Sequence, residues 1–487
     1  MSRSIRDCPG RPEDANPYPD AITKSYEIQV ITPLFGGGAK AGENDEVTLI
    51  RPSSIRGHLR FWWRATRGAR FEAVEELRQR EGEVWGTTEN PSPVSIEIAV
   101  EERDEPSECA HYKWNPKKRR GEGGYDLRWS HPFNRRGNPL TYVLFPFQGT
   151  PPDSENPKLP TKIVRSVRFR LTVRIPKQEL IRRYIPVYNK QREEKGLTQL
   201  VDEDHNIEID VEAALWAWVN FGGIGARTRR GCGALHCLEA NPLDPDLIPP
   251  SLQEFKDWLK DRLTYFGLPL SSESGDKKWP TFGKIYMKDG RDLISCWENS
   301  ISIMKDFRQG VEVGRNLGSD RRPGRSRWPE PESLRELVLR QQNLPSRPHR
   351  WHPPDHRIKD LAFPRVEFGM PIIIEIRGEN IKPTLQHDKD HDRMASPLIL
   401  RPITFSNGRF ASMILRLNTP ILESAYVKPG KRDLVSGCMI TASQIRDPLN
   451  AEYEDSPMSG LCDTGSALDA FIAFAIAEER GFQEVGL

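Results

Sequence analysis

The stretch Phe221-Gly-Gly-Ile-Gly-Ala-Arg-Thr-Arg-Arg-Gly-Cys-Gly-Ala-Leu235 packs five glycines and three arginines into fifteen residues. It follows an apolar segment with helical spacing, residues 208–221, and precedes a predicted strand. Glycine lets backbone amides approach a phosphate closely, and arginine donates paired hydrogen bonds to phosphate oxygens. The stretch therefore predicts a phosphate-binding loop, and the alternative interpretation is a tight, solvated turn.

This loop matches neither common nucleotide-binding motif. The P-loop pattern G-x-x-x-x-G-K-[ST] is absent, and the dinucleotide pattern follows a strand, whereas this loop follows a helix. We therefore predict no cofactor, and a nucleic-acid backbone is a better ligand than ATP or NAD. The residues expected to contact RNA here are Gly222, Gly223, Gly225, Arg227, Arg229, Arg230, Gly231 and Gly233.

A second basic segment lies near the N-terminus. Arg51-Pro52-Ser53-Ser54 predicts a helix start with a serine cap, and the helix is expected over 55–71. Its apolar residues recur at helical spacing on one face, and its arginines recur on another. We expect the second face to line the same groove as the loop, with help from the glycine-rich segment 35–42. The expected contacts are Lys40, Arg51, Arg56, Arg60 and Arg64.

The order of predicted elements suggests a duplicated α+β fold. Strand, helix, two strands and helix recur in 23–240 and in 281–487, which predicts two sandwiches of the ferredoxin-like type with large loop and helical insertions. Around them we expect a flexible arm (1–22), a linker with one short helix (241–280) and insertions at 101–139 and 309–364. The expected strands are 25–32, 94–100, 140–147, 164–175, 282–287, 371–376, 398–405 and 410–417, and further helices are expected at 208–221, 292–308 and 466–479.

The string GGIGARTRRGCG resembles the glycine-rich loop of the RAMP superfamily of CRISPR proteins. Three further segments sharpen the resemblance toward the first subunit of type III-B (Cmr) effector complexes. They are Ile31-Thr-Pro-Leu-Phe-Gly-Gly-Gly38, Arg51-Pro-Ser-Ser-Ile-Arg-Gly-His-Leu-Arg-Phe-Trp-Trp-Arg-Ala65 and Arg393-Met-Ala-Ser-Pro-Leu-Ile-Leu400. The order of the elements extends the resemblance across most of the chain.

This resemblance implies a role as well as a fold. It implies ferredoxin-like domains of the RNA-recognition type in a non-catalytic, cytoplasmic subunit of an RNA-guided interference complex. Such a subunit contacts guide or target RNA near the 3′ part of the guide, beside other RAMP subunits of the Cmr complex. Cleavage of the target is assigned to a different subunit.

Two alternatives belong to other functional classes. A related RAMP branch processes guide RNA with a catalytic histidine, for which His58 is the candidate, although general acid–base catalysis needs a second group in reach. The arginines around His58 are expected to lower its pKa. The other alternative is a scaffold whose basic faces meet acidic protein partners.

Histidine clusters and aromatic residues offer weaker candidates. His349, His352 and His356 have spacing that a metal ion could use, as do His387 and His391 with their neighbouring aspartates, but a solvated loop is the simpler interpretation of both. We therefore expect no metal. Trp62, Trp63 and Trp216 fit helix-core spacing, whereas Trp114 and Trp129 lie in a basic insertion where they could stack on bases.

The overall charge conceals local basic regions. The 487 residues include 71 Lys and Arg and 69 Asp and Glu, a net charge of +2. Residues 51–80 nevertheless carry a net +5, residues 162–195 a net +8, and residues 441–487 a net −7. Local basic surface is what a polyanion meets. The seven cysteines contain no C-x-x-C pair, and no apolar run approaches the length of a membrane span.

Overall fold

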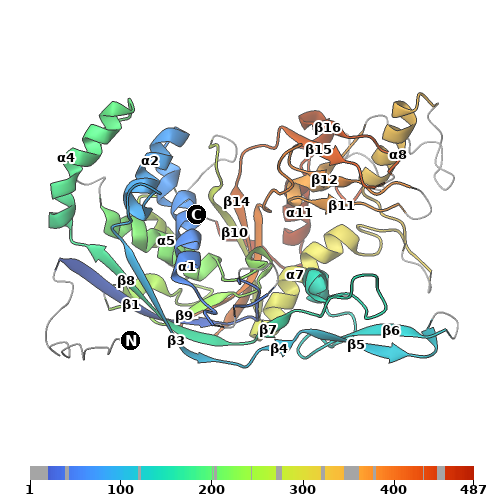
Figure 1. Cartoon of the computed structure of the whole chain (residues 1–487), viewed down its shortest axis with the longest axis horizontal. Helices are drawn as coiled ribbons and strands as arrows, with labels where there is room; N and C mark the ends of the chain where they lie inside the picture. The colour runs from blue at the N-terminus through green and yellow to red at the C-terminus, as the bar shows by residue number, and fades with distance from the viewer. Residues whose placement is uncertain are drawn as a thin grey trace, which may run out of the picture.

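The computed structural model describes residues 20–38, 43–45, 47–118, 122–199, 201, 206–242, 244–269, 277–319, 324–344, 361–376, 380–431, 433–446 and 456–486. Helices and antiparallel sheets are mixed in both halves of the chain, which confirms the α+β class (Figure 1). No helix among these residues combines the length and the apolarity needed to cross a bilayer.

The first sheet has four strands in the spatial order β3-β8-β1-β9, each antiparallel to its neighbours. The strands are β1 (Ala21–Val30), β3 (Ser95–Arg103), β8 (Val167–Pro176) and β9 (Leu235–Glu239). Helices α1 (Pro52–Ala65) and α2 (Val74–Trp85) follow β1 in the chain, and helices α4 (Gln178–Glu194) and α5 (Ile207–Phe221) follow β8.

The second sheet repeats this order with later strands. Its spatial order is β13-β14-β10-β17, and neighbouring strands are again antiparallel. The strands are β10 (Thr281–Gly290), β13 (Leu398–Thr404), β14 (Phe410–Asn418) and β17 (Gln483–Glu484). Helix α7 (Leu293–Gln309) follows β10 in the chain, and α11 (Ala467–Ile476) precedes β17.

Smaller elements are inserted between these. A third sheet contains β11 (Ile372–Ile373), β12 (Thr384–Gln386), β15 (Ser424–Lys428) and β16 (Cys438–Thr441), and a fourth contains β2 (Leu34–Phe35), β7 (Lys162–Val164) and β4 (Ser107–Glu108). Strands β5 (Ala110–Asn115) and β6 (Gly124–Trp129) form a hairpin inside the expected insertion 101–139. The remaining helices are α3 (Thr141–Leu144), α6 (Phe255–Tyr265), α8 (Glu330–Gln341) and α9 (Ala442–Ile445).

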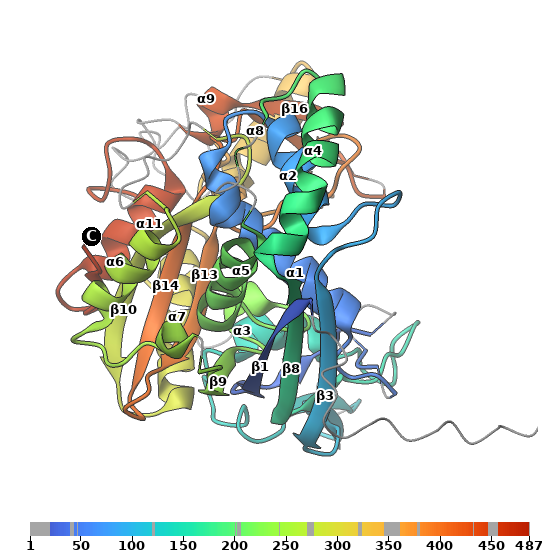
Figure 2. The same cartoon turned by 90° about the vertical axis from the view of Figure 1, so that its left-hand side faces the viewer.

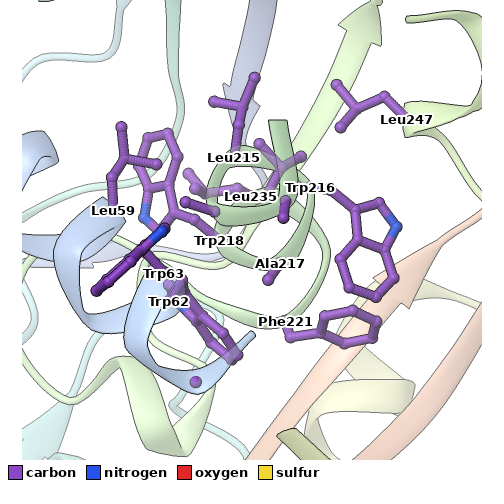
Figure 3. Packing of buried hydrophobic residues seen from close by; sticks show 14 of the residues in the cluster. Leu59, Trp62, Trp63, Leu215, Trp216, Ala217, Trp218, Phe221, Leu235 and Leu247 are labelled. Carbon is purple, nitrogen blue, oxygen red and sulfur yellow. The ribbon is translucent and has the colours of Figure 1, made fainter. Parts of the chain in front are cut away.

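Helices α1 and α5 form a layer between the two large sheets (Figure 2). Their apolar side chains share one core with the inner face of the first sheet and with Ile285, Ile399 and Met413 of the second. Trp63 and Trp216 are fully buried in this layer, as their helical spacing predicts (Figure 3). Because it is covered from both sides, α5 is buried almost all round, rather than on the single face expected of an amphipathic helix.

A buried ionic network ties the helices of the first half together. Asp210 of α5 accepts hydrogen bonds from Arg80 of α2 at 2.6 Å and from Arg67 at 3.2 Å. Glu83 in turn pairs with Arg80 at 3.3 Å and with Arg192 of α4 at 2.9 Å. Burial alone raises the pKa of Asp210, but the two arginines outweigh it and hold that pKa below its usual value.

Two local predictions are wrong. Residues 140–147, expected as a strand, form α3 and a short 3₁₀ turn, and their apolar side chains pack into the second core. The helix expected from residue 55 begins at Pro52 with Arg51 as its cap residue, and no side chain caps it. Proline suits this first helical position, because its fixed φ is helical and it lacks an N–H that would have no partner there.

The arginine-rich face of β8 is also less basic than its sequence suggests. The alternation of buried Val167 and Phe169 with Arg168 and Arg170 is confirmed. However, glutamates of the neighbouring strands face these arginines across the sheet. The closest contacts are Arg168–Glu102 at 3.0 Å, Arg170–Glu101 at 2.9 Å and Arg174–Glu97 at 2.7 Å. Cross-strand pairing therefore neutralises much of the local charge of +8.

Candidate nucleic-acid interface

The glycine-rich loop connects α5 to β9, and its glycines are required by its own backbone. Gly225, Gly231 and Gly233 have φ values of +84°, +76° and +62°, a region that other residues rarely adopt. A Cβ atom on Gly233 would lie 1.9 Å from the carbonyl oxygen of Ile224. These glycines therefore have a structural role, whatever ligand the loop binds.

The loop packs directly against the second half of the chain. Arg230 donates a hydrogen bond to the Leu398 carbonyl at 2.8 Å, and Arg229 donates to the Ser396 carbonyl. In the other direction, the indole of Trp297 donates to the Arg230 carbonyl at 2.8 Å. Burial lowers the pKa of Arg229 and of Arg230 to about 10. Two of the three loop arginines thus join the halves of the molecule as well as carrying charge.

Arg227 differs from its two neighbours. Its side chain is exposed, and it makes no hydrogen bond or ion pair with any described residue. Its backbone has a φ of +59°, in the left-handed region. A residue other than glycine costs about 1–2 kcal/mol there, and such outliers gather at functional sites. The loop therefore presents one free guanidinium group at a strained position.

The first glycine-rich segment lies beside this loop. The amide of Ala226 donates to the Phe35 carbonyl at 2.6 Å, and a Cβ atom on Gly37 would lie 3.5 Å from Gly225. Arg51 donates a hydrogen bond to the Gly37 carbonyl. Gly37, which accepts this hydrogen bond, thus lies beside the loop that carries Arg227. A role for Arg51 in binding RNA there stays a prediction. Lys40 lies outside the described residues.

The other arginines of α1 have partners within the molecule. Arg60 and Arg64 both bind Glu81 of α2 at 2.6 Å and are each about one-third exposed, at 37% and 34%. Arg56 donates to the Val94 carbonyl at 3.2 Å. The spacing of the arginines along α1 does not predict these contacts, because Glu81 lies on a separate helix that packs against α1. A role for the three arginines at the loop stays a prediction.

His58 lies in a cavity between α1 and the glycine-rich loop. The cavity has a volume of about 170 Å³, and its lining includes His58, Phe61, Trp62, Thr228 and Arg229. Burial lowers the pKa of His58 to about 4, so the expected direction is right but its cause is desolvation, not the neighbouring arginines. The lining contains no carboxylate and no second histidine.

The metal candidates receive no support from the described residues. His391 binds Asp388 through Nδ1 at 2.9 Å, and within the described part of the chain no three His, Cys, Asp or Glu residues are grouped to hold an ion. His349, His352 and His356 lie outside the described residues.

The two tryptophans of the 101–139 insertion have different surroundings. Trp114 is half exposed and stands edge-on to Tyr125, whereas Trp129 packs against the second core.

A buried residue that no motif in the sequence identifies fixes the loop. Arg401 of β13 is fully buried and donates to the carbonyls of Gly222 and Leu235, both at 2.6 Å. These carbonyls lie at the two ends of the glycine-rich loop. The only signal in the sequence is position, because Arg401 directly follows the quoted segment Arg393–Leu400.

Comparisons with known proteins found one family profile and two curated relatives. The sequence profile of the RAMP superfamily matches residues 27–236. The CRISPR system Cmr subunit Cmr1-1 of Pyrococcus furiosus is 24% identical over 296 residues, which cover 59% of this chain and 68% of that protein. The Cmr subunit Cmr1-2 of the same organism is 28% identical over 214 residues, which cover 43% of this chain and 92% of that protein.

Two solved structures also match this chain, at lower sequence identity. The crystal structure of Cmr1 from Pyrococcus furiosus in its apo form superposes with a TM-score of 0.43 and 17% identity, covering 82% of this chain and 89% of that one. A chain of the type III-B Cmr-beta complex bound to cognate target RNA superposes with a TM-score of 0.43 and 13% identity, covering 82% of this chain and 94% of that one.

Proposed function

Because the RAMP superfamily profile matches residues 27–236 and the curated relatives are Cmr subunits, we propose that this chain is a RAMP protein and a non-catalytic, RNA-binding subunit of a type III-B CRISPR interference complex. It contacts guide RNA, target RNA or both near the 3′ end of the guide. Its protein partners are the other RAMP subunits of that complex. It acts in the cytoplasm and uses no cofactor.

The proposal includes the fold of both halves. Residues 23–240 and 281–487 are each a ferredoxin-like domain, and 241–280 link them. Support comes from the strand order: if the strands of each large sheet are numbered along the chain, both sheets read second, third, first, fourth. Helices follow the first and third strand in each case, which gives the β-α-β-β-α-β succession of this fold.

The RNA-binding proposal rests on the surroundings of Arg227. Its side chain is exposed and makes no hydrogen bond or ion pair with any residue that the structure describes, although partial burial lowers the pKa of the guanidinium. The glycine loop that carries it lies beside Gly37, whose carbonyl accepts a hydrogen bond from Arg51. A guanidinium group suits a phosphate oxygen, which it can bind through two parallel hydrogen bonds. Phosphate contacts position a protein on RNA without reading sequence. Binding is therefore expected to depend weakly on sequence and strongly on salt.

Replacing Arg227 by glycine separates this role from a structural one. Glycine removes the charge and also relieves the left-handed backbone, so stability is expected to stay level or rise by up to about 1 kcal/mol. Affinity for a fluorescent 30-nucleotide single-stranded RNA is expected to fall about tenfold, measured by anisotropy at low salt. The matched control is Arg183→Ala, which removes an exposed arginine from α4, at the far end of the first domain. Equal affinities for the two variants would contradict the proposal.

The non-catalytic assignment predicts that His58 does not cleave RNA. Burial lowers the pKa of His58 to about 4, so the imidazole is almost entirely neutral at pH 7 and a poor general acid there, and the lining of its cavity contains no carboxylate and no second histidine. End-labelled RNA incubated with the wild-type chain in EDTA is expected to stay intact, as it does with His58→Ala. Cleavage by the wild type that disappears in His58→Ala would instead identify a guide-processing nuclease.

A further inference from the structure

We propose that the cavity between α1 and the glycine-rich loop holds one unstacked pyrimidine base of the bound RNA. This inference rests on the proposed function and deepens it. The loop that carries Arg227 bounds the cavity, because Thr228 and Arg229 of this loop form part of its wall. Arg227 would bind a phosphate at the cavity's edge, and Thr228 would contact the inserted base. Because these two residues are adjacent, the phosphate and the base would belong to neighbouring nucleotides of one RNA strand.

The size of the cavity selects a single ring. An apolar cavity of about 150 Å³ holds one benzene molecule, so a volume of about 170 Å³ admits one pyrimidine ring. A purine adds a second fused ring and would have to extend into the opening. The glycine-rich loop contributes Gly222 and Gly223 to the lining, so no side chain from these positions occupies the space.

The walls offer planar groups for stacking. The guanidinium of Arg229 lies over the ring of Phe61, with its carbon 5.1 Å from the ring centroid. Trp62 stands edge-on to Phe61 at 5.3 Å, which fixes the orientation of that ring. Aromatic rings and arginine planes are the surfaces on which proteins stack unpaired RNA bases.

The polar groups of the lining suit the edge of such a base. A neutral imidazole can donate through one nitrogen and accept through the other, and a hydroxyl can do both. His58 and Thr228 therefore match the mixed donors and acceptors of uracil or cytosine, and Arg229 adds further donors. The low pKa of His58 keeps its accepting nitrogen available at neutral pH. The ring of His58 is also held parallel to Trp218, with centroids 6.2 Å apart.

Cross-linking tests where the base lies. A 12-nucleotide oligouridine carrying one 5-iodouridine per molecule is irradiated in complex with the full chain, and the linked peptide is identified by mass spectrometry. The expected adduct is on His58, Phe61 or Trp62. Adducts found only elsewhere, with binding intact, would overturn the base pocket and leave the RNA-binding function standing. If the wild-type chain binds no RNA, the proposed function itself fails and the pocket fails with it.

Substitution of Phe61 tests what the pocket contributes. Phe61→Leu is expected to weaken binding of the oligouridine about 5- to 20-fold and to remove its preference over oligoadenosine of equal length, because base–aromatic stacking is lost. Phe61→Tyr keeps the ring and is expected to restore both. The control is Tyr184→Leu, which removes a half-exposed aromatic side chain from α4. Wild-type affinity in Phe61→Leu, or a wild-type preference for oligoadenosine, would overturn the proposal; melting curves confirm that each variant is folded.

Discussion

Replacing Arg401 by leucine is expected to lower the free energy of unfolding by about 3 kcal/mol and to weaken RNA binding at the same time. The side chain is fully buried, and its hydrogen bonds hold the carbonyls of Gly222 and Leu235. Leucine leaves those carbonyls without their partner, at about 1–3 kcal/mol for each buried group. The loop between them then loses the contact that fixes both of its ends.

The measurement is urea unfolding followed by tryptophan fluorescence, with RNA affinity measured on the same preparations. Arg409→Leu is the control, since Arg409 lies in the connection between β13 and β14, is 63% exposed and pairs with Asp289 in solvent. An exposed pair of this kind contributes about 0–1 kcal/mol. If Arg401→Leu unfolded at the same urea concentration as Arg409→Leu, Arg401 would not join the two halves as described.

Removing the carboxylate of Asp210 is expected to cost about 3–5 kcal/mol. Asp210 is fully buried between Arg80 and Arg67, and replacement by alanine leaves the buried charge of Arg80 without its closest partner. The packing of α4 is expected to be destabilised as well, because Glu83 pairs both with Arg80 and with Arg192 of α4. Chemical unfolding at pH 7 measures it, and Asp257→Ala on α6, an exposed carboxylate, is the control. A loss below about 1 kcal/mol would contradict the role of the network.

The same residue gives a pH dependence with a definite sign. The arginines hold the pKa of Asp210 below its unfolded value, so its contribution is present above the unfolded pKa of about 3.8 and is lost as the pH falls through the folded value. The stability difference between wild type and Asp210→Ala is therefore expected to be full at pH 7 and to shrink below about pH 4. A difference that grew on acidification would reverse the assignment.

The sequence predicts most strands of the two large sheets and the helices α1, α5, α7 and α11, but it does not predict α2 or α4. The alternation in β8 and the helical spacing of Trp62 and Trp63 identify buried faces, because one face of each element meets a core. The full burial of α5 could not be predicted in this way. It arises because the second sheet covers the side of the helix that the first sheet leaves open, and that contact joins segments nearly 200 residues apart.

Charge was the least reliable guide to the site. The arginines of β8 and of α1 look alike in the sequence, yet Arg170 faces Glu101 across a strand pair and Arg60 faces Glu81 across a helix pair. Only packing shows that Arg227 has no polar partner among the described residues, while Arg229 and Arg230 bind carbonyls of the second half. The glycines located the loop correctly, because their positive φ values are a local property of the backbone.

The salt dependence of RNA binding tests most directly whether Arg227 contacts phosphate. The association constant of a 30-nucleotide single-stranded RNA is measured for the wild type and for Arg227→Gly over a range of salt concentrations. Each phosphate contact adds about 0.7 to the slope of log affinity against log salt for a single strand. The account predicts that the slope for Arg227→Gly is shallower by about that amount. Parallel lines for the two proteins would contradict it.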